Sequence, residues 1–343
     1  MPGPLESPAI KEALSMEPIT IACWGYDRTR PLATGEVAVE GCEVTFLDLG
    51  PEEMFHRAFH FEQFDATELS FSNYLTLTAR DSCPYIAIPA FPGRRFRHGG
   101  IYINTECGIA APEDLKGRII GTPEYQMTAS VWIRGLFQDE FGVEPSDVAW
   151  RAGGLWQPAR TEKIRFDAPA GVELERIEPH QTLSQMLLDG EIDALISPRA
   201  PRGFGTPGVP VARLFPDYIA REKDYFRRTG IFPIMHLIAI HKKKVEALPW
   251  LAASLFKAFE AAKDMAVQRL LEENEPMATY PWIDGVIKEA QEFMGEDFWP
   301  YGLEPNRKTL EAFLGYHFDQ GLAARELSIE EIFVPSTLSQ SRI

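Results

Sequence analysis

The sequence predicts an α/β protein of two lobes, joined by two crossover hinges and separated by a ligand cleft. Short β-branched runs alternate with amphipathic stretches along most of the chain, as in repeated βα units. Several of these runs stop at polar residues, and open α/β sheets bind their ligands at such strand ends. A late apolar run at 230–240 returns the chain toward the first strands, which favours a discontinuous first lobe.

The length and composition fit this arrangement. The 343 residues are 45% apolar, as expected for a globular chain long enough for two ordinary domains. We expect lobe 1 to comprise residues 18–104 and 238–333, with the C-terminal helices, and lobe 2 to comprise residues 105–237. The ends, 1–17 and 334–343, are predicted to be flexible.

The formal charge of −16 restricts the partners of the chain. Nucleic acids and anionic membranes require a basic face, so we expect neither as the main partner. An anionic small molecule can still bind where a local group of arginines outweighs the overall negative charge. The N-terminal segment 1–18 lacks the features of a secretory signal, no apolar run could span a bilayer, and the four cysteines form no CxxC pair. Together these features predict a cytoplasmic location.

The first predicted strand, 19–24, ends in a charged loop. Arg28 and Arg30 in this loop could grip a carboxylate through paired hydrogen bonds. Asp27 could orient an arginine or exchange a proton. The structural alternative is an Asp–Arg pair that holds a turn.

The second predicted strand, 43–49, leads into a helix that opens with proline and two acids at 51–53. His56 and His60 on this helix have the i, i+4 spacing of metal ligands. No third ligand is suggested and the glutamate of an HExxH motif is absent, so we interpret them as part of a solvated or packed helix face. No metal or other cofactor is expected.

Two further strand ends carry polar groups in lobe 1. Ser70 and Ser72 follow the strand at 64–70, where they could cap the next helix or receive an anion. The strand at 85–89 leads into a loop that contains three arginines and a histidine, a dense cationic group for so acidic a chain. A solvated loop is possible, but we favour the interpretation that part of it faces the site. The candidates in this loop are Arg94, Arg97 and His98.

Lobe 2 offers a corner that could face these groups. A strand at 101–104 crosses into it, and a second strand at 119–122 is followed by a polar turn and a helix that ends near 141–142. The candidate site residues in this turn are Glu124, Tyr125, Gln126 and Thr128. Beyond a strand at 147–150, the loop 153–170 is long enough to be a lid or a peripheral excursion.

The remaining elements complete lobe 2 and return the chain to lobe 1. A short strand at 174–177, a capped helix from 182 and a strand ending at 196 place Arg199 at another strand end. His236 interrupts the apolar return strand at 230–240. A lone histidine on such a strand is more often a hydrogen-bonded core residue, but this one lies where a hinge should cross the cleft. A long amphipathic helix from 249 to 272 and further helical segments follow.

Four segments carry a resemblance to a known family. They are WGYDRTRPL at 24–32, PEYQMTA at 123–129, GEIDAL at 190–195 and TGIFPIMH at 229–236. Within the type II periplasmic-binding-protein-like fold that two lobes and two crossovers describe, they resemble the 4,5-dihydroxyphthalate decarboxylase family from about residue 18 to about residue 333. The resemblance implies a cofactor-free carboxy-lyase that converts 4,5-dihydroxyphthalate to protocatechuate and carbon dioxide.

This chemistry defines what the site must contain. Direct loss of an aryl carboxylate leaves a carbanion in the ring plane, so the easier route protonates the ring carbon first. The enzyme then needs a cationic clamp for the carboxylate that stays, an acceptor for the phenol proton, and an acid near the ring carbon. We expect Arg28 and Arg30, supported by Arg94 or Arg97, to be the clamp.

The proton is assigned to His98 or His236, with Glu124 and Asp27 as competitors. Tyr125, Gln126 and Thr128, opposite Ser70 and Ser72, are expected to hydrogen-bond the substrate. Further substrate-binding candidates are Trp24, Tyr26 and Arg199.

The alternative is a protein without chemistry, because folds of this kind mostly serve solute capture. A transport receptor should be exported, and the missing signal argues against it. A sensor for an aromatic carboxylate remains open. In either case the expected partner is a small aromatic carboxylate, and the sequence leaves a homo-oligomer open.

Overall fold

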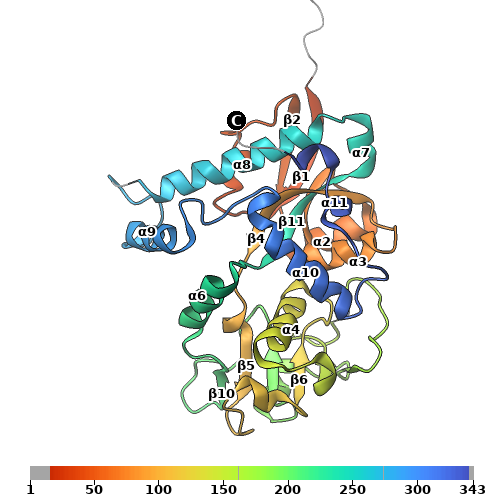
Figure 1. The fold of residues 1–343 in the computed structure, drawn as a ribbon, viewed down its shortest axis with the longest axis vertical. Coiled ribbons are helices and arrows are strands. Elements are labelled where there is room, and N and C mark those ends of the chain that lie inside the picture. Colours follow the sequence, from red (N-terminus) through yellow and green to blue (C-terminus); the bar gives the residue numbers. More distant parts are fainter. Residues whose placement is uncertain (1–15, 161, 273, 340–343) are drawn as a thin grey trace, which may run out of the picture.

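The computed structural model describes residues 16–160, 162–272 and 274–339. Figure 1 shows two lobes, one above the other, with the chain crossing between them near α6 and at the start of β5. Most of the predicted flexible ends, 1–15 and 340–343, lies outside the described residues, whereas Glu17 already begins the first strand.

Sheet 1 lies in the upper lobe and has the strand order β2-β1-β3-β11-β4. Strands β1 to β3 are parallel, while β11 is antiparallel to both of its neighbours, β3 and β4. The return strand predicted from the sequence is therefore inserted inside the sheet. The strands are β1 (Glu17–Cys23), β2 (Cys42–Asp48), β3 (Ala66–Ser70), β4 (Tyr85–Arg94) and β11 (Ile234–His241).

Sheet 2 lies in the lower lobe and has the order β10-β5-β9-β6-β7-β8. Its strand β5 is antiparallel to β9 and β10, because the chain enters this lobe from the hinge side. The strands are β5 (Ile101–Asn104), β6 (Ile119–Thr122), β7 (Ala149–Ala152), β8 (Glu173–Arg176), β9 (Ala194–Ile196) and β10 (Val211–Arg213).

Helices cover the faces of both sheets, and their ends follow local sequence signals. Helix α2 begins at Pro51 with Glu52 and Glu53 in its first turn, and α4 ends at Gly142, whose φ of 60° suits glycine. The helices are α1 (Arg30–Ala33), α2 (Pro51–Phe61), α3 (Phe71–Thr78), α4 (Thr128–Phe141), α5 (Leu183–Leu188), α6 (Tyr218–Thr229), α7 (Lys242–Ala247), α8 (Leu251–Leu270), α9 (Ile283–Met294), α10 (Arg307–Asp319) and α11 (Ile329–Ile332).

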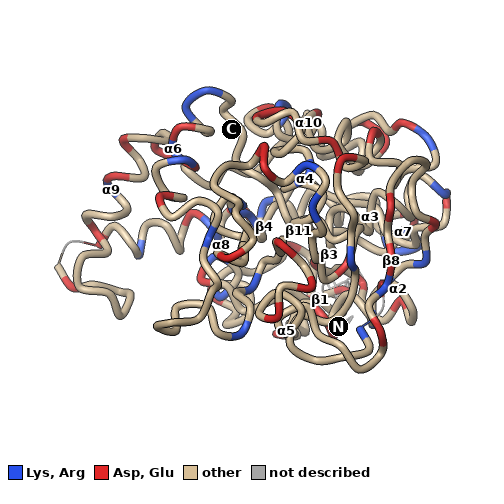
Figure 2. The backbone as a smooth tube through the Cα atoms, turned by 90° about the horizontal axis from the view of Figure 1, so that it is seen from below, with Lys and Arg blue, Asp and Glu red and all other residues tan. Residues whose placement is uncertain are grey.

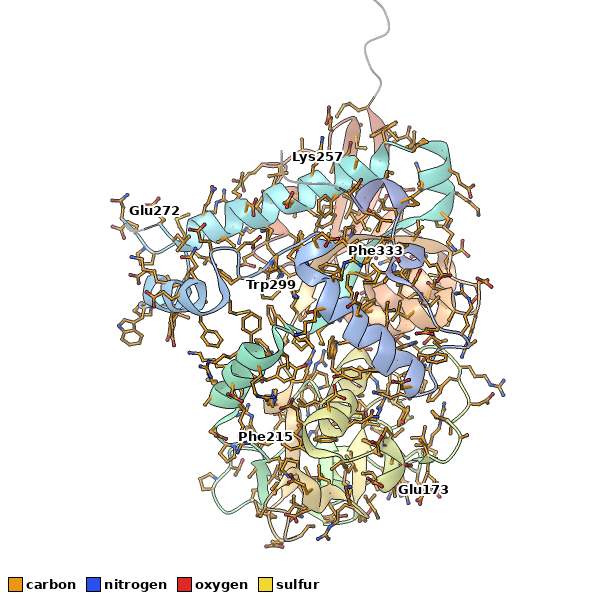
Figure 3. All side chains as sticks on the ribbon, in the orientation of Figure 1. Glu173, Phe215, Lys257, Glu272, Trp299 and Phe333 are labelled. Carbon is orange, nitrogen blue, oxygen red and sulfur yellow. The ribbon has the colours of Figure 1, made fainter. Side chains whose placement is uncertain are left out.

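One hydrophobic core runs through both lobes, because α4 of the lower lobe packs against α10 and the return strand. The indole Nε1–H of Trp132 on α4 donates to the carbonyl oxygen of Ile234 on β11, at 2.8 Å. Trp132 also packs against Phe313 of α10. The side chains of the whole molecule are drawn in Figure 3, where Trp299 marks the segment between α9 and α10. These contacts hold the strand ends of the two sheets against each other.

Charges of both signs are interspersed along the chain rather than divided between the lobes, as Figure 2 shows. Among the described residues, no helix has the length and apolar character needed to cross a membrane. The same part of the chain contains no group of three or more His, Cys, Asp or Glu side chains arranged to hold a metal ion. The rings of His56 and His60 contact each other on α2 at an angle of 47°, with 4.6 Å between their centroids.

Candidate active site

A fully buried carboxylate, Glu68, lies in the middle of sheet 1. Four donors converge on its two oxygens: the Cys23 thiol at 3.2 Å, the Trp24 backbone N–H at 3.0 Å, the Tyr26 hydroxyl at 2.8 Å and His236 Nδ1 at 2.6 Å. Burial opposes ionisation, but the hydrogen bonds and the positive character of His236 outweigh it and lower the pKa of Glu68. Glu68 is therefore an anion that holds a histidine ring.

His236 is the histidine at this position, and the pairing of its strand fixes where it points. In the register of sheet 1, His236 lies opposite Ser70 on β3 and Gly93 on β4. Phe55 of α2 packs edge-on against its ring, with 5.0 Å between centroids. About a fifth of its side chain stays exposed, with 20% relative accessibility. Since Nδ1 donates to Glu68, Nε2 is the nitrogen free to exchange a proton, and it has no hydrogen-bond partner within the described chain.

The charged loop after β1 is organised around Arg28. Its guanidinium lies between the rings of Tyr26 and Trp299, 4.0 and 4.3 Å from their centroids. Arg28 Nε donates to the Pro92 carbonyl at 2.6 Å, and Nη1 donates to Asp27 Oδ1 at 3.0 Å. Asp27 thus orients Arg28, which is one of the two roles that the sequence left open.

The other members of that loop point elsewhere. Arg30 is exposed at the start of α1 and lines neither of the two cavities described below. Trp24 is 45% exposed, with its ring edge-on to Tyr26 at 5.5 Å. The predicted pair of clamping arginines therefore does not come together as a pair in this structure.

The polar strand ends of the two lobes meet at Thr128. Its hydroxyl shares a 3.1 Å hydrogen bond with Ser70 Oγ and accepts the backbone N–H of Ser72 at 3.0 Å. All three side chains are buried. The predicted juxtaposition of Ser70 and Ser72 with Thr128 is present, and it joins the lobes directly.

The rest of the corner after β6 faces the interior of lobe 2. The ring of Tyr125 lies 3.7 Å below the Arg134 guanidinium, and Gln126 donates its side-chain amide to the Ile164 carbonyl. Glu124 is 1% exposed and accepts from Arg160 Nε at 2.9 Å and from Lys163 Nζ at 2.6 Å. None of these three side chains of the corner lines either cavity.

His98, the other predicted proton carrier, is buried between Phe215 and Tyr225. Burial lowers the pKa of His98 to about 4, so its ring is neutral at physiological pH. Neither His98 nor His236 lines either cavity. His98 differs from His236 in that aromatic rings surround it and its buried Nδ1 has no hydrogen-bond partner within the described chain, as expected for a core residue rather than a proton carrier.

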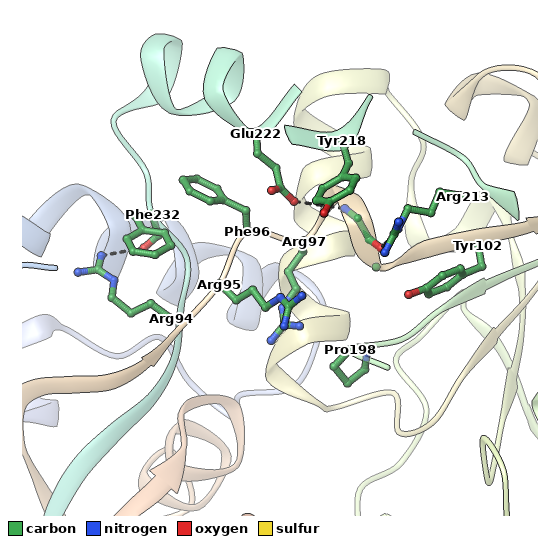
Figure 4. Close-up of a pocket in the computed structure, with 12 residues that line it drawn as sticks. Arg94, Arg95, Phe96, Arg97, Tyr102, Pro198, Arg213, Tyr218, Glu222 and Phe232 are labelled. Carbon is green, nitrogen blue, oxygen red and sulfur yellow. Dashed lines mark hydrogen bonds between the residues drawn. The ribbon is translucent and has the colours of Figure 1, made fainter. Parts of the chain in front are cut away.

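Two cavities open between the lobes, and Pro198 lines both. The larger, of about 480 Å³, is lined by Glu52, by the 153–170 loop around Trp156, and by Arg199. The Arg199 guanidinium lies 5.6 Å from the Trp156 ring centroid. The smaller, of about 240 Å³, lies at the crossovers and includes Arg94 and Arg97 (Figure 4).

Two of the predicted arginines differ in their freedom to bind a ligand. Arg94 is held by the carbonyl oxygens of Pro300 and Phe232, to which its two terminal nitrogens donate at 3.0 and 2.8 Å. Arg97 makes only a weak contact from Nε to the sulfur of Met235 at 3.1 Å. Arg97 therefore retains terminal donors for a ligand, while Arg94 has a structural part.

The 153–170 loop is tied to both lobes by an ion network. Arg160 and Lys163 each contact Glu52 on α2 of lobe 1 and Glu124 of lobe 2. Although burial opposes ionisation, Lys163 and Arg160 lower the pKa of Glu52 to about 2. The loop therefore covers the larger cavity as a strap between the lobes.

Sequence reasoning missed Glu68, Glu52 and the two cations of the strap. One signal was present for Glu68, since a carboxylate stands in the middle of the short strand Ala66–Ser70, every residue of which is buried. The strap gave no such signal, because Arg160 and Lys163 lie 36 and 39 residues from Glu124 in a stretch without periodicity.

Two curated relatives match the chain. The 4,5-dihydroxyphthalate decarboxylase of Comamonas testosteroni is 42% identical over 325 residues, which cover 95% of this chain and 98% of that protein. The 4,5-dihydroxyphthalate decarboxylase of Pseudomonas putida is 46% identical over 210 residues, which cover 61% of this chain and 81% of that protein. No family model matches the chain.

Solved structures share the fold at low identity. The periplasmic aliphatic sulphonate binding protein SsuA from Escherichia coli has a TM-score of 0.51 at 12% identity, with 95% of each chain covered. A periplasmic sulfonate-binding protein SsuA from Methylobacillus flagellatus has a TM-score of 0.52 at 12% identity, with 94% of this chain and 93% of that chain covered. They confirm the predicted two-lobed, periplasmic-binding-protein-like fold and nothing beyond the fold.

Proposed function

The chain belongs to the 4,5-dihydroxyphthalate decarboxylase family, and on that premise we propose that it is a carboxy-lyase acting through the Glu68–His236 pair. Its substrate is 4,5-dihydroxyphthalate, and its products are protocatechuate and carbon dioxide. The single observation that carries the mechanism is a buried glutamate 2.6 Å from one ring nitrogen of a histidine whose other ring nitrogen is unpartnered within the described chain.

The pair suits the proton transfer that this reaction needs. An anion hydrogen-bonded to Nδ1 fixes the tautomer and stabilises the imidazolium, so Nε2–H becomes a positioned acid. Positioned acid–base groups contribute about a hundred- to ten-thousandfold in rate. The carboxylate of Glu68 is fully buried and the ring of His236 is largely buried, so little water reaches the contact between them. The low local polarity strengthens the attraction between the carboxylate and the imidazolium.

The proposed step balances in protons and electrons. The phenol para to the departing carboxylate gives its proton to water, and the resulting phenolate pushes electron density onto the ring carbon that carries this carboxylate. His236 Nε2–H gives its proton to that carbon, and a new C–H bond forms. The bond to the carboxylate then breaks, its electron pair returns to the ring, and carbon dioxide leaves. The neutral imidazole and the phenolate of the product each regain a proton from solvent.

The surrounding polar groups have supporting parts in this proposal. Arg28 keeps one terminal nitrogen without a described acceptor and presents positive charge near Tyr26. Ser70 and Thr128 supply hydroxyls where the lobes meet. We propose that these groups orient the substrate, because hydrogen-bonding groups that are already in place need no reorganisation during the reaction.

The test is an assay of purified protein with 4,5-dihydroxyphthalate, following protocatechuate and carbon dioxide. We expect turnover by the wild type and a loss of about a hundredfold or more in kcat for His236→Gln. The matched control is His241→Gln, because His241 lies on the same strand and pairs with Glu62 at 3.0 Å near the surface. Full activity of His236→Gln would exclude this histidine as the acid.

A binding protein without chemistry is the second candidate, favoured by the fold shared with the sulphonate-binding proteins. The same preparation distinguishes it. Thermal stabilisation by 4,5-dihydroxyphthalate without any product would support binding alone, whereas turnover of a different aromatic acid would keep the mechanism and change the substrate.

A further inference from the structure

The smaller cavity carries an excess of positive charge, because four arginines and one glutamate are among the residues that line it. Arg95, Arg97 and Arg213 line it, and none of them forms an ion pair with a carboxylate within the described residues. In Figure 4 the side chains of Arg95 and Arg97 converge, and their guanidinium ends overlap in this view. Burial, and then the neighbouring Arg95, lowers the pKa of Arg97, and the attraction of Glu222 opposes this shift without cancelling it.

The partners that these arginines do have are weak or neutral. Arg213 Nε donates to the Gly99 carbonyl at 3.0 Å and its guanidinium lies 4.6 Å from the Tyr218 ring centroid. The carboxylate on this wall is Glu222, whose Oε1 accepts the backbone N–H of Gly99 at 3.2 Å. Glu222 interacts electrostatically with Arg95, Arg97 and Arg213, but a single carboxylate does not balance three arginines. In a chain of net charge −16, this local excess of positive charge points to an anionic ligand.

The position of the cavity connects it with the proposed acid. Its walls come from both crossovers, through Arg94 and Phe232 among others. Arg94 is paired with Ile234 on β11, and the adjacent Gly93 is paired with His236. The cavity therefore begins at the end of the same β4–β11 pairing that holds the imidazole of His236.

The charge that each carboxylate of the substrate keeps during the reaction indicates which of the two this cavity should bind. The departing carboxylate loses its charge as it becomes carbon dioxide, so a strong cationic site on it would stabilise the ground state more than the transition state. The carboxylate that stays keeps its charge throughout, and binding it there positions the ring without that cost.

We propose that the cavity is a carboxylate subsite, in which Arg95, Arg97 and Arg213 hold the carboxylate that the product retains. This inference rests on the proposed function for the identity of the substrate. It assigns specificity rather than proton transfer to these arginines, and it differs from the expectation that Arg28 and Arg30 form the clamp.

The test measures binding of the product, which needs no turnover. Arg97→Gln and Arg213→Gln are expected to weaken protocatechuate binding about 10- to 100-fold each, as for the loss of a charge-assisted hydrogen bond. Catechol, which lacks the carboxylate, is expected to bind these variants within about twofold of the wild type. Arg95→Gln is a second variant that breaks no described side-chain hydrogen bond. Arg227→Gln is the control, because Arg227 is 65% exposed on α6.

Each outcome decides the question. An unchanged affinity for protocatechuate in Arg97→Gln, Arg213→Gln and Arg95→Gln overturns the subsite, as does an equal loss for catechol. Inorganic phosphate that competes with protocatechuate in the wild type but not with catechol supports a carboxylate site, whereas phosphate binding without competition indicates a separate anion site and overturns the assignment. Absence of turnover by the wild type would reject the proposed function alone, since the contrast between protocatechuate and catechol is read from binding.

Discussion

His236 Nδ1 contacts Glu68 Oε1 across two neighbouring strands of sheet 1, although 168 positions separate the two residues in the sequence. Glu68 also accepts from Cys23, Trp24 and Tyr26, so its position is fixed independently of the histidine. The ring of His236 is consequently oriented by a rigid anion. Substitutions that alter this anion or the packing around the ring should therefore change proton transfer.

Glu68→Gln should reduce turnover while the protein stays folded. The amide can still accept from Nδ1–H, but it no longer stabilises the imidazolium, so the alkaline limb of the kcat profile should move to lower pH. We expect a kcat loss of about a hundredfold. Glu62→Gln serves as control, because Glu62, at the end of α2, pairs with His241 on the strand that carries His236. An unchanged pH profile in Glu68→Gln would mean that the carboxylate has no part in proton transfer.

Gly93→Ala should displace the ring of His236 without touching its chemistry. A Cβ atom at residue 93 would lie 2.7 Å from Nδ1 and 2.9 Å from Cβ of His236, which is closer than real contacts allow. We expect a loss of stability of about 1 to 3 kcal/mol, as for overpacking, and a larger loss in kcat than in substrate affinity. Gly285→Ala on α9 is the control, since nothing lies within 4 Å of the added atom. Wild-type kcat in Gly93→Ala would show that the ring position is not critical.

Glu52→Gln should loosen the strap over the larger cavity. Arg160 and Lys163 would lose their lobe 1 partner but keep Glu124, so the free energy of unfolding should change by less than about 1 kcal/mol. Trypsin cleavage after Arg160, Lys163 or Arg165 should become faster, because these bonds lie in the released loop. Glu53→Gln is the matched control, since Glu53 pairs with Arg57 on the same helix. Equal cleavage rates in the two variants would argue against a strap.

In His98→Phe the free energy of unfolding should fall less steeply below about pH 6.5 than it does in the wild type. The pKa of His98 falls from an ordinary 6.5 to about 4 on folding, so the unfolded chain binds the extra proton between these values. Proton binding by His98 therefore does not reduce the free energy of unfolding above about pH 6.5. As the pH falls from 6.5 toward 4, it lowers the free energy of unfolding of the wild type by up to about 3 kcal/mol. Glu140 opposes this shift, while Arg221 and Arg228 add to it.

Urea unfolding at several pH values between 4 and 7 measures the effect. The difference in unfolding free energy between His98→Phe and the wild type should grow in favour of the variant as the pH falls. His56→Gln, on an exposed face of α2, should follow the wild type at every pH. A parallel decline in all three proteins would mean that other groups cause it. Turnover of His98→Phe at pH 7 should stay near that of the wild type.

The sequence located strand ends well because the alternation of β-branched runs with polar turns is a local property. It placed Ser70 opposite Thr128 and put His236 at the hinge for this reason. Helix α6, at Tyr218–Thr229, was not predicted, because most of its residues are charged or polar and only Tyr225 is buried, so the segment contains no apolar run that draws attention.

Side-chain direction within a turn was not predictable. Tyr125 and Gln126 follow a strand end as expected, but the packing of Arg134 and the 153–170 loop turns them into lobe 2. Glu68 was missed for a related reason, since its burial depends on donors from β1 and β11 that only the tertiary fold supplies. Local patterns specify where chain segments end, while long-range partners decide which polar groups are buried there.

The insertion of β11 between β3 and β4 has a consequence for biosynthesis. Sheet 2 is built entirely from residues 101–213, whereas sheet 1 remains divided until residues 234–241 emerge and pair with both halves. Since domains tend to fold as units during synthesis, the second lobe can finish on the ribosome before the first. A nascent chain that stops short of residue 234 carries all the arginines of the smaller cavity but has only half of the proton-transfer pair.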